Sequence, residues 1–168
     1  MLRLENITFS YDEDTEALKD VTLNIEKGKK TLFLGENGSG KSTLFLIMNG
    51  LLQAQKGDIY FEGEKIKHKK KDLEDLRRKV GIIFQDPEIQ IFAPLVFQEV
   101  AYGPENLGYS KEKVETAVNK AMEEINITDL KDRPCHHLSY GQKKRVSIAA
   151  ITAMEPELLI LDEPTAWL

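Results

Sequence analysis

The stretch Thr31-Leu-Phe-Leu-Gly-Glu-Asn-Gly-Ser-Gly-Lys-Ser-Thr43 decides the fold of this chain. Residues 35–42 match the pattern G-x-x-x-x-G-K-[ST] at every fixed position. The loop follows a short apolar run, 31–34, and precedes apolar residues at helical spacing, so we expect a buried strand, a loop and a helix. Glycines let the backbone curve closely around a phosphate, and the amides of the loop and of the helix N-terminus point at the anion. The stretch therefore predicts a nucleoside triphosphate site.

Residue types within this loop indicate individual contacts. Lys41 would reach the β- and γ-phosphates, while the Ser42 hydroxyl would coordinate Mg²⁺. The nucleotide-binding residues that we expect here are Gly35, Glu36, Asn37, Gly38, Ser39, Gly40, Lys41, Ser42 and Thr43.

Length and composition limit the protein class. The chain has 168 residues, a net charge of −5 and one cysteine, Cys135. The length fits one domain, the acidic balance argues against nucleic acid as the main partner, and a lone cysteine fits a reducing compartment. The chain has neither an apolar run of the roughly 18 residues that a membrane helix needs nor the apolar core of a signal peptide at its start. We therefore expect a soluble, cytoplasmic, single-domain protein.

The order of apolar patterns predicts an α/β fold with an antiparallel β part at the N-terminus. Alternating apolar residues over 2–9, with one slip typical of a bulge, and over 21–25 predict two antiparallel strands. Strands that are apolar on both faces are typical of a parallel sheet covered by helices; such runs occupy 31–34, 80–84 and 158–161. Helical spacing predicts further helices that begin at Ser110 and near Tyr140.

Two carboxylates follow the last apolar strand, where parallel sheets place ligand chemistry. Asp162 suits a contact to Mg²⁺ through water, and Glu163 suits the orientation or deprotonation of an attacking water. Gln85 ends another apolar strand and could contact the metal or the water. Read alone, all three are ordinary polar strand ends. Together with the phosphate loop, they predict Glu163 and Gln85 as catalytic residues and Ser42, Gln85 and Asp162 as metal ligands.

A second helix start is chemically suited to an anion. In Leu138-Ser-Tyr-Gly-Gln-Lys-Lys-Arg145, a serine, a glycine and free amides open the helix and three cations follow. By itself this pattern describes an ordinary capped helix.

In combination, these motifs resemble the ATP-binding cassette (ABC) ATPase family over essentially the whole chain. The resemblance is carried, in order, by the loop 35–42, Gln85, the stretch 138–142 and Leu158-Leu-Ile-Leu-Asp-Glu-Pro-Thr165. It implies a P-loop NTPase fold with a nucleotide-binding core at about 1–84 and 155–168 and a helical subdomain at 86–154. It also implies that Tyr11 stacks on adenine. The family works as a head-to-tail dimer, so Ser139, Gly141 and Gln142 would contact the γ-phosphate bound by a second ATPase subunit.

A narrower resemblance is to the ATPases of energy-coupling-factor importers, especially the cobalt and nickel type. Residues 84–92 and 99–108 carry it, together with Tyr140 in the stretch 138–142 and the short start over 4–11. It implies a peripheral protein on the cytoplasmic face of the membrane, whose segment after Gln85 grips a helix of an integral membrane subunit. The apolar residues available for that groove, or alternatively for a buried core, are Ile89, Ile91, Phe92, Leu95, Val96 and Phe97.

The chain departs from the family at its end. Family members usually continue with an aspartate, another strand and a switch histidine that holds the γ-phosphate, whereas this sequence ends at Leu168 and its histidines all precede Asp162. The resemblance therefore implies a copy that is truncated shortly after the carboxylates Asp162 and Glu163. We expect ATP binding to survive, and hydrolysis by this chain alone stays open.

Several alternatives remain at this point. The same motor could serve a vitamin transporter, or the chain could be a catalytically incomplete nucleotide-binding remnant. A nucleic-acid-associated ABC ATPase has only the basic stretch 65–79 in its favour, and nucleic acid is not an expected partner. Cys135 is expected to be an inert thiol, because adjacent His136 and His137 do not have zinc-ligand spacing with it.

Overall fold

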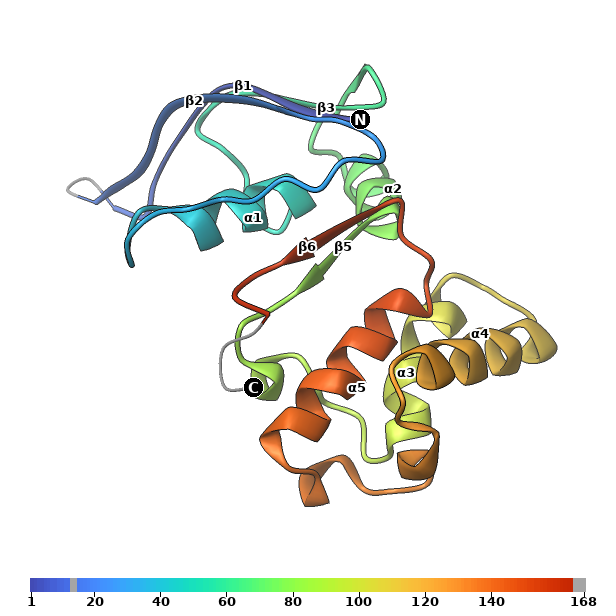
Figure 1. The fold of residues 1–168 in the computed structure, drawn as a ribbon. Helices are drawn as coiled ribbons and strands as arrows, with labels where there is room; N and C mark the ends of the chain where they lie inside the picture. Colours follow the sequence, from blue (N-terminus) through green and yellow to red (C-terminus); the bar gives the residue numbers. More distant parts are fainter. Residues whose placement is uncertain (13–14, 165–168) are drawn as a thin grey trace. The chain divides into compact units, whose positions relative to one another are not determined.

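The computed structural model describes residues 1–12 and 15–164, and the chain forms two compact units, Met1–Arg77 and Arg78–Leu168 (Figure 1). The motif end at Thr165 lies outside the described residues. The elements are β1 (Leu2–Ser10), β2 (Glu16–Ile25), α1 (Lys41–Asn49), β3 (Lys56–Phe61), β4 (Glu64–Lys65), α2 (Lys70–Lys79), β5 (Val80–Ile83), α3 (Val96–Asn106), α4 (Lys111–Glu124), α5 (Tyr140–Thr152) and β6 (Leu158–Leu161), with short 3-10 turns at Pro87–Ile89, Thr128–Leu130 and Cys135–His137.

The first unit contains an antiparallel sheet in the order β2-β1-β3-β4. Leu2 and Leu4 pair with Ile25 and Leu23, and the register shifts before Ile7. The alternation predicted for β1 is confirmed, because the side chains of Leu2, Leu4 and Ile7 are fully buried. The predicted slip is confirmed as well.

The bulge in β1 brings its backbone against β3. A Cβ atom added to Gly57 would lie 2.4 Å from the Glu5 carbonyl oxygen and 2.5 Å from that of Asn6. Gly57 also has a φ of +91°, a conformation that L-residues rarely adopt. This position therefore requires glycine for two independent reasons.

The predicted buried strand over 31–34 is wrong. The segment pairs with no described strand, and Leu32 and Leu34 are 79% and 84% exposed. Only Phe33 has a ring contact, edge-on to Phe45 with the centroids 5.4 Å apart. An apolar run becomes a strand only where a neighbouring strand takes up its backbone hydrogen bonds, and the described residues provide none.

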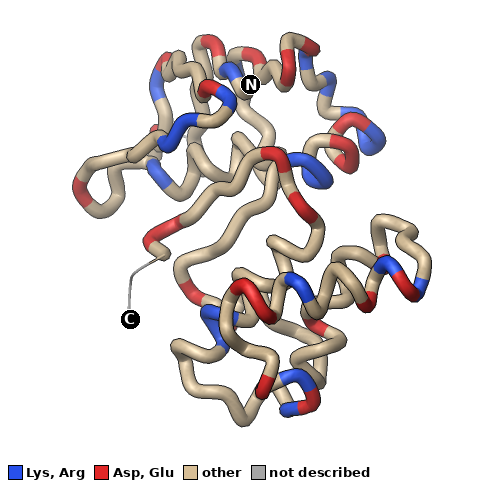
Figure 2. Tube along the Cα trace, turned by 45° about the vertical axis from the view of Figure 1, so that its right-hand side comes forward, with Lys and Arg blue, Asp and Glu red and all other residues tan. Residues whose placement is uncertain are grey.

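The basic stretch 65–79 lies partly in α2, and an acidic segment at 72–75 separates its two basic segments; Figure 2 shows acidic and basic residues mixed over the chain. Lys65 lies 2.7 Å from an oxygen of Asp58, and Lys70 lies 4.0 Å from Glu74. All four side chains are at least 40% exposed, which is typical of a solvated surface.

The second unit is built on a parallel pair of strands. β5 and β6 pair from Val80 opposite Leu158 to Ile83 opposite Leu161, as predicted for two of the three apolar runs. β5 is buried throughout, whereas Leu159 and Leu161 of β6 are 36% and 41% exposed. The expectation that both faces of this last strand are buried is therefore wrong within the described residues.

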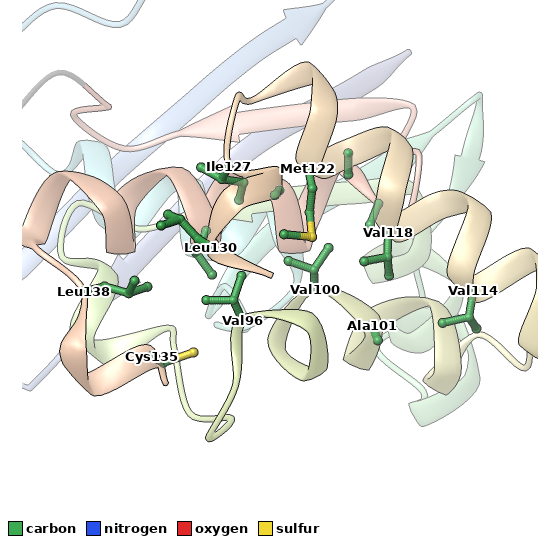
Figure 3. Close-up of a cluster of buried hydrophobic side chains, with 14 residues drawn as sticks. Val96, Val100, Ala101, Val114, Val118, Met122, Ile127, Leu130, Cys135 and Leu138 are labelled. Atoms are coloured by element: carbon green, nitrogen blue, oxygen red, sulfur yellow. The ribbon is translucent and has the colours of Figure 1, made fainter. Parts of the chain in front are cut away.

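Three helices of the second unit enclose an apolar core (Figure 3). Helix α4 begins where predicted, because the Ser110 hydroxyl accepts a hydrogen bond from the Lys113 amide at 3.3 Å. Helix α3 was not predicted, since Gly103 and Pro104 resemble a helix end in the sequence. The core consists of Val96, Val100, Ala101, Val114, Val118, Ala121, Met122, Ile127, Leu130, Cys135, Leu138, Val146, Ala149 and Ala153.

Replacement of Gly57 tests the close approach of β1 and β3. Gly63→Ala is a matched control, because Gly63 has a φ of +88° but open space around the added Cβ. We expect Gly63→Ala to lower the free energy of unfolding by about 1–2 kcal/mol from backbone strain alone. Gly57→Ala should lower it by about 1–3 kcal/mol more, because the added carbon meets backbone oxygens. Equal losses for the two variants in urea unfolding would contradict this account.

Candidate functional site

The glycine-rich loop of the first unit leads directly into α1. Gly40 is the N-cap of the helix, has a φ of +88° and supplies no side-chain hydrogen bond to the first turn. A Cβ atom at Gly40 would lie 2.5 Å from the Ala17 carbonyl oxygen, so the loop and β2 approach each other closely. A helix start that lacks a side-chain cap and acidic residues is suited to an anion.

The Lys41 ammonium group lies within the curve of the loop. It donates hydrogen bonds to the carbonyl oxygens of Gly35 and Glu36, both at 2.8 Å, and lies 3.4 Å from the Ser39 hydroxyl. Gly35 itself cannot carry a side chain there, because a Cβ would lie 2.7 Å from that hydroxyl. Three residues of the loop, Gly35, Glu36 and Ser39, thus place oxygen atoms around a single cation.

Tyr11 lies beside the same helix start. Its hydroxyl forms a 3.0 Å hydrogen bond with that of Thr43, whose side chain is buried, and the tyrosine is 58% exposed. The ring also packs edge-on against Phe9 at 5.0 Å between centroids. An exposed aromatic ring is therefore held next to the loop, as stacking on a base requires.

In the second unit, the pairing of β5 with β6 brings two predicted catalytic residues together. The Gln85 side-chain amide donates to a Glu163 carboxylate oxygen at 2.8 Å. The Asp162 amide donates to the Ile83 carbonyl oxygen at 3.0 Å, so the parallel pairing continues past the last strand residue. Glu163 has a φ of +43°, which is uncommon for a residue other than glycine.

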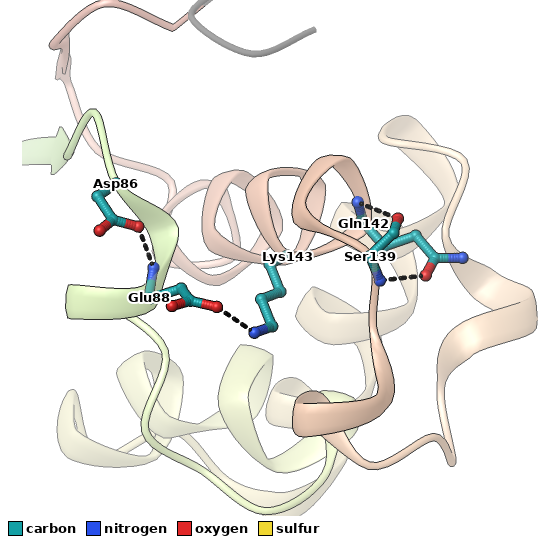
Figure 4. Close-up of polar contacts among 5 residues, drawn as sticks. All are labelled: Asp86, Glu88, Ser139, Gln142 and Lys143. Atoms are coloured by element: carbon teal, nitrogen blue, oxygen red, sulfur yellow. Dashed lines mark hydrogen bonds and ion pairs between the residues drawn. The ribbon is translucent and has the colours of Figure 1, made fainter.

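The start of α5 is capped from both sides (Figure 4). The Ser139 hydroxyl accepts from the Gln142 amide at 3.3 Å, and the Gln142 side-chain oxygen accepts from the Ser139 amide at 2.9 Å. This reciprocal capping box stabilises the helix start. It leaves the hydroxyl hydrogen of Ser139 and the side-chain NH₂ of Gln142 as donors outside the box.

The segment after Gln85 divides into exposed and buried residues. Ile89 and Phe92 are 71% and 63% exposed, whereas Val96 is fully buried. The Phe92 ring packs edge-on against the exposed ring of Tyr102, with the centroids 4.6 Å apart. The segment therefore contains both exposed apolar residues and residues of the buried core.

A hollow of about 440 Å³ adjoins this exposed surface. The buried carboxylate of Glu99 shapes its rim, because one oxygen accepts from the backbone amides of Phe92 at 3.0 Å and Ala93 at 2.7 Å. The Asp86 carboxylate caps the turn at Pro87–Ile89, and Lys143 forms an ion pair with Glu88 (Figure 4). The hollow is lined by Glu88, Ile91, Phe92, Ala93, Pro94, Cys135, His136 and Lys143.

Sequence reasoning missed two buried charged residues, Glu99 and Lys144. Lys144 stands in a run of three cations, which is typical of a solvated helix face. The spacing of three residues between Lys144 and Ser147 could have indicated its burial, because it places both residues on the buried face of α5. Glu99 is likewise three residues from the buried Val96.

Comparison with known proteins identifies the class. The family model described as "ABC transporter" matches residues 18–166, and the chain belongs to this family. A putative ABC transporter ATP-binding protein of Methanosarcina mazei is 54% identical over 98% of this chain and 36% of its own length. The energy-coupling factor transporter ATP-binding protein EcfA of Methanocaldococcus jannaschii is 47% identical over 100% of this chain and 60% of its own length. The chain thus spans less than two thirds of these curated relatives.

Solved structures agree with the fold. The structure of cbiO1 from Clostridium perfringens, part of the ABC transporter complex cbiONQ, matches 99% of this chain and 66% of its own with 44% identity and a TM-score of 0.88. A dimeric ATP-binding cassette, MJ0796, bound to ADP and Pi, matches 99% of this chain and 75% of its own with 29% identity and a TM-score of 0.89. Among the described helices, none is long and apolar enough to cross a membrane.

Cys135 provides a test of burial in the second unit. Burial, with a smaller effect of the Glu99 carboxylate, raises the pKa of the thiol from 9.0 to about 11. We therefore expect the native chain to react with a thiol reagent at pH 8 at least about 100-fold more slowly than the chain in urea, because the thiolate fraction is small and access is blocked. The single cysteine makes the readout unambiguous. Equal rates in the two conditions would show that this site is open.

The raised pKa of Cys135 also predicts how its contribution to the stability of the fold changes with pH. A pKa raised by folding adds stability that is complete below pH 9 and is lost as the pH rises toward 11. Cys135→Ala should remove this component of the decline in stability between pH 9 and 11, as followed by urea unfolding.

Proposed function

We propose that this chain is the ATP-binding and ATP-hydrolysing motor of a membrane importer of the energy-coupling-factor type. The observation that carries the proposal is the ring of loop oxygens around the Lys41 ammonium at an uncapped helix start. The 2.8 Å contact between Gln85 and Glu163 at the strand ends supports the hydrolytic part. The named relatives support the transporter class.

In this proposal the nucleotide is held by residues of the first unit. The amides of the loop 35–43 and the Lys41 ammonium bind the phosphates, and the exposed ring of Tyr11 stacks on adenine. The Lys41 ammonium already lies against the loop, and phosphate oxygens would replace the carbonyl oxygens as its partners.

The Mg²⁺ ligands are proposed from the chemistry of their donor atoms alone. The Ser42 hydroxyl, the Gln85 side-chain oxygen and the Asp162 carboxylate are hard donors of the kind that this ion prefers. The bound ion would neutralise charge on the phosphates. Glu163 would accept a proton from the attacking water or orient it, with Gln85 fixing the direction of the carboxylate.

Two further surfaces would bind the two protein partners of this chain. Ser139, Gly141 and Gln142 at the start of α5 would contact the nucleotide bound by a second ATPase subunit, as donors outside the capping box. The exposed Ile89 and Phe92 beside the hollow would receive a helix of an integral membrane subunit. The chain would then lie peripherally on the cytoplasmic face of the membrane.

The transported substrate is proposed from the narrower resemblance alone. The residues at 84–92 and 99–108 favour cobalt or nickel ions, and a vitamin is the alternative. The expected division into a nucleotide-binding core at 1–84 and 155–168 and a helical subdomain at 86–154 belongs to the same proposal.

Removal of the loop cation tests nucleotide binding. We expect Lys41→Ala to weaken binding of ATP with Mg²⁺ at least about 100-fold in calorimetric titration, because the phosphates lose their fixed cation. Lys30→Ala, which removes an exposed lysine outside the loop, is the matched control and should bind like the unchanged chain. Phosphate release measured in parallel separates a working motor from a catalytically incomplete remnant. Equal affinity in all three chains would contradict the proposed site.

A photo-crosslinking residue at position 92 tests the membrane partner. When the chain is expressed in the cell that encodes it, Phe92 replaced in this way should capture an integral membrane protein, because its ring is exposed beside the hollow. The same residue at Lys113, an exposed position on α4, is the control. Capture at both positions, or at neither, would argue against a specific docking surface.

A further inference from the structure

Lys144 is buried more completely than any other charged residue that the structure describes. Its side chain is 1% exposed, and its ammonium group donates to the carbonyl oxygens of Phe84 at 2.6 Å and Gln85 at 3.0 Å. These two residues directly follow β5. A lysine on α5 therefore contacts the backbone that leads into the predicted catalytic glutamine.

Burial of this ammonium group is costly and must be compensated. Burial lowers the pKa of Lys144, and the carboxylates of Asp162 and Asp86 oppose that effect. Two hydrogen bonds to backbone carbonyls and two nearby carboxylates retain the charge in an interior position. A group held at such a cost in one geometry is suited to fixing the atoms that it contacts.

Other residues of the first turns of α5 contact the same segment. The Tyr140 hydroxyl donates to the Gln85 carbonyl oxygen at 3.4 Å, and Lys143 pairs with Glu88. Positions 140, 143 and 144 are spaced so that they share one helix face. The segment is thus held by contacts from a single helix face.

The backbone that leads to Gln85 has a further contact, from Gln90. The Gln90 side chain accepts from the Phe84 amide at 3.1 Å and lies 3.4 Å from the Ile82 carbonyl oxygen. With both carbonyls held by Lys144, the backbone has little freedom left. The Gln85 side chain itself is exposed and reaches Glu163.

We propose that Lys144 is a positioning residue for Gln85, which it holds through the carbonyl oxygens of Phe84 and Gln85 so that the glutamine amide stays directed at Glu163. The role deepens the proposed function, because it concerns the same catalytic pair. A lysine suits it, since one compact ammonium group can donate to two adjacent carbonyl oxygens.

Hydrogen exchange of the whole chain tests the positioning directly. Lys144→Met keeps the length and removes the donor, Lys144→Arg restores donors, and Lys120→Met is a control that removes an exposed lysine paired with Glu155. We expect amides of 84–90 to exchange about tenfold faster in Lys144→Met, while those of α4 keep their rate. Lys144→Arg should recover most of the protection, and Lys120→Met should leave 84–90 unchanged.

Two results would overturn the proposal. One is unchanged exchange over 84–90 in Lys144→Met. The other is equal acceleration over the whole second unit, which would mean that the lysine only stabilises the fold. The exchange experiment needs no nucleotide, so it decides the positioning role even where the unchanged chain fails to bind ATP and the proposed function falls.

Steady-state kinetics then tests the consequence for catalysis. Where the unchanged chain hydrolyses ATP, Lys144→Met should lower kcat about tenfold and leave KM for ATP within about twofold, because the phosphate loop keeps its residues. Lys144→Arg should recover kcat in part. Equal kcat for Lys144→Met and the unchanged chain would overturn the catalytic part of the proposal.

Discussion

The parallel pairing of β5 with β6 is the constraint on which the second unit depends. It places Gln85 and Glu163, 78 positions apart in the chain, at adjacent strand ends and within 2.8 Å of each other. The bond from the Asp162 amide to the Ile83 carbonyl oxygen extends the pairing into the motif itself. A shift of one residue in this register would turn the carboxylates away from the glutamine. The contact between Gln85 and Glu163 therefore depends on the register of these two short strands.

The helices α1 and α5 differ in how the free backbone amides of their first turns find hydrogen-bond partners. The first turn of α1 begins at Gly40 without a side-chain cap, and Lys41 is the only cation in the ring of loop oxygens that the described contacts form. The first turn of α5 is capped by Ser139 and Gln142 on each other. An uncapped start has amide donors available for a ligand of its own, whereas a closed box presents only side-chain donors to a ligand that is bound elsewhere. This difference fits the separate roles proposed for the two motifs.

The sequence predicted those features whose chemistry is local. The phosphate loop follows from the spacing of glycine, lysine and serine, and the capped starts at Ser110 and Ser139 follow from side chains that reach the next turn. Features that depend on partners far away in the sequence were predicted wrongly or missed. The run 31–34 has the composition of a strand, but no described strand pairs with it. Lys144 resembled a solvated cation because its carbonyl partners lie about 60 positions away. Pro104 concealed α3, since core packing offsets the hydrogen bond that it cannot donate.

We propose that residues 138–142 of a second ATPase subunit complete the nucleotide site, and nucleotide-dependent self-association tests this pairing directly where the second subunit is another copy of this chain. Glu163→Gln should bind ATP without consuming it, because the amide cannot accept the proton of the attacking water. With ATP and Mg²⁺, sedimentation of this variant should show dimers that revert to monomers when the nucleotide is removed. The same variant with Ser139→Glu should stay monomeric, since a carboxylate would face the phosphates. A chain that binds ATP yet sediments as a monomer at every concentration would contradict pairing between copies of this chain.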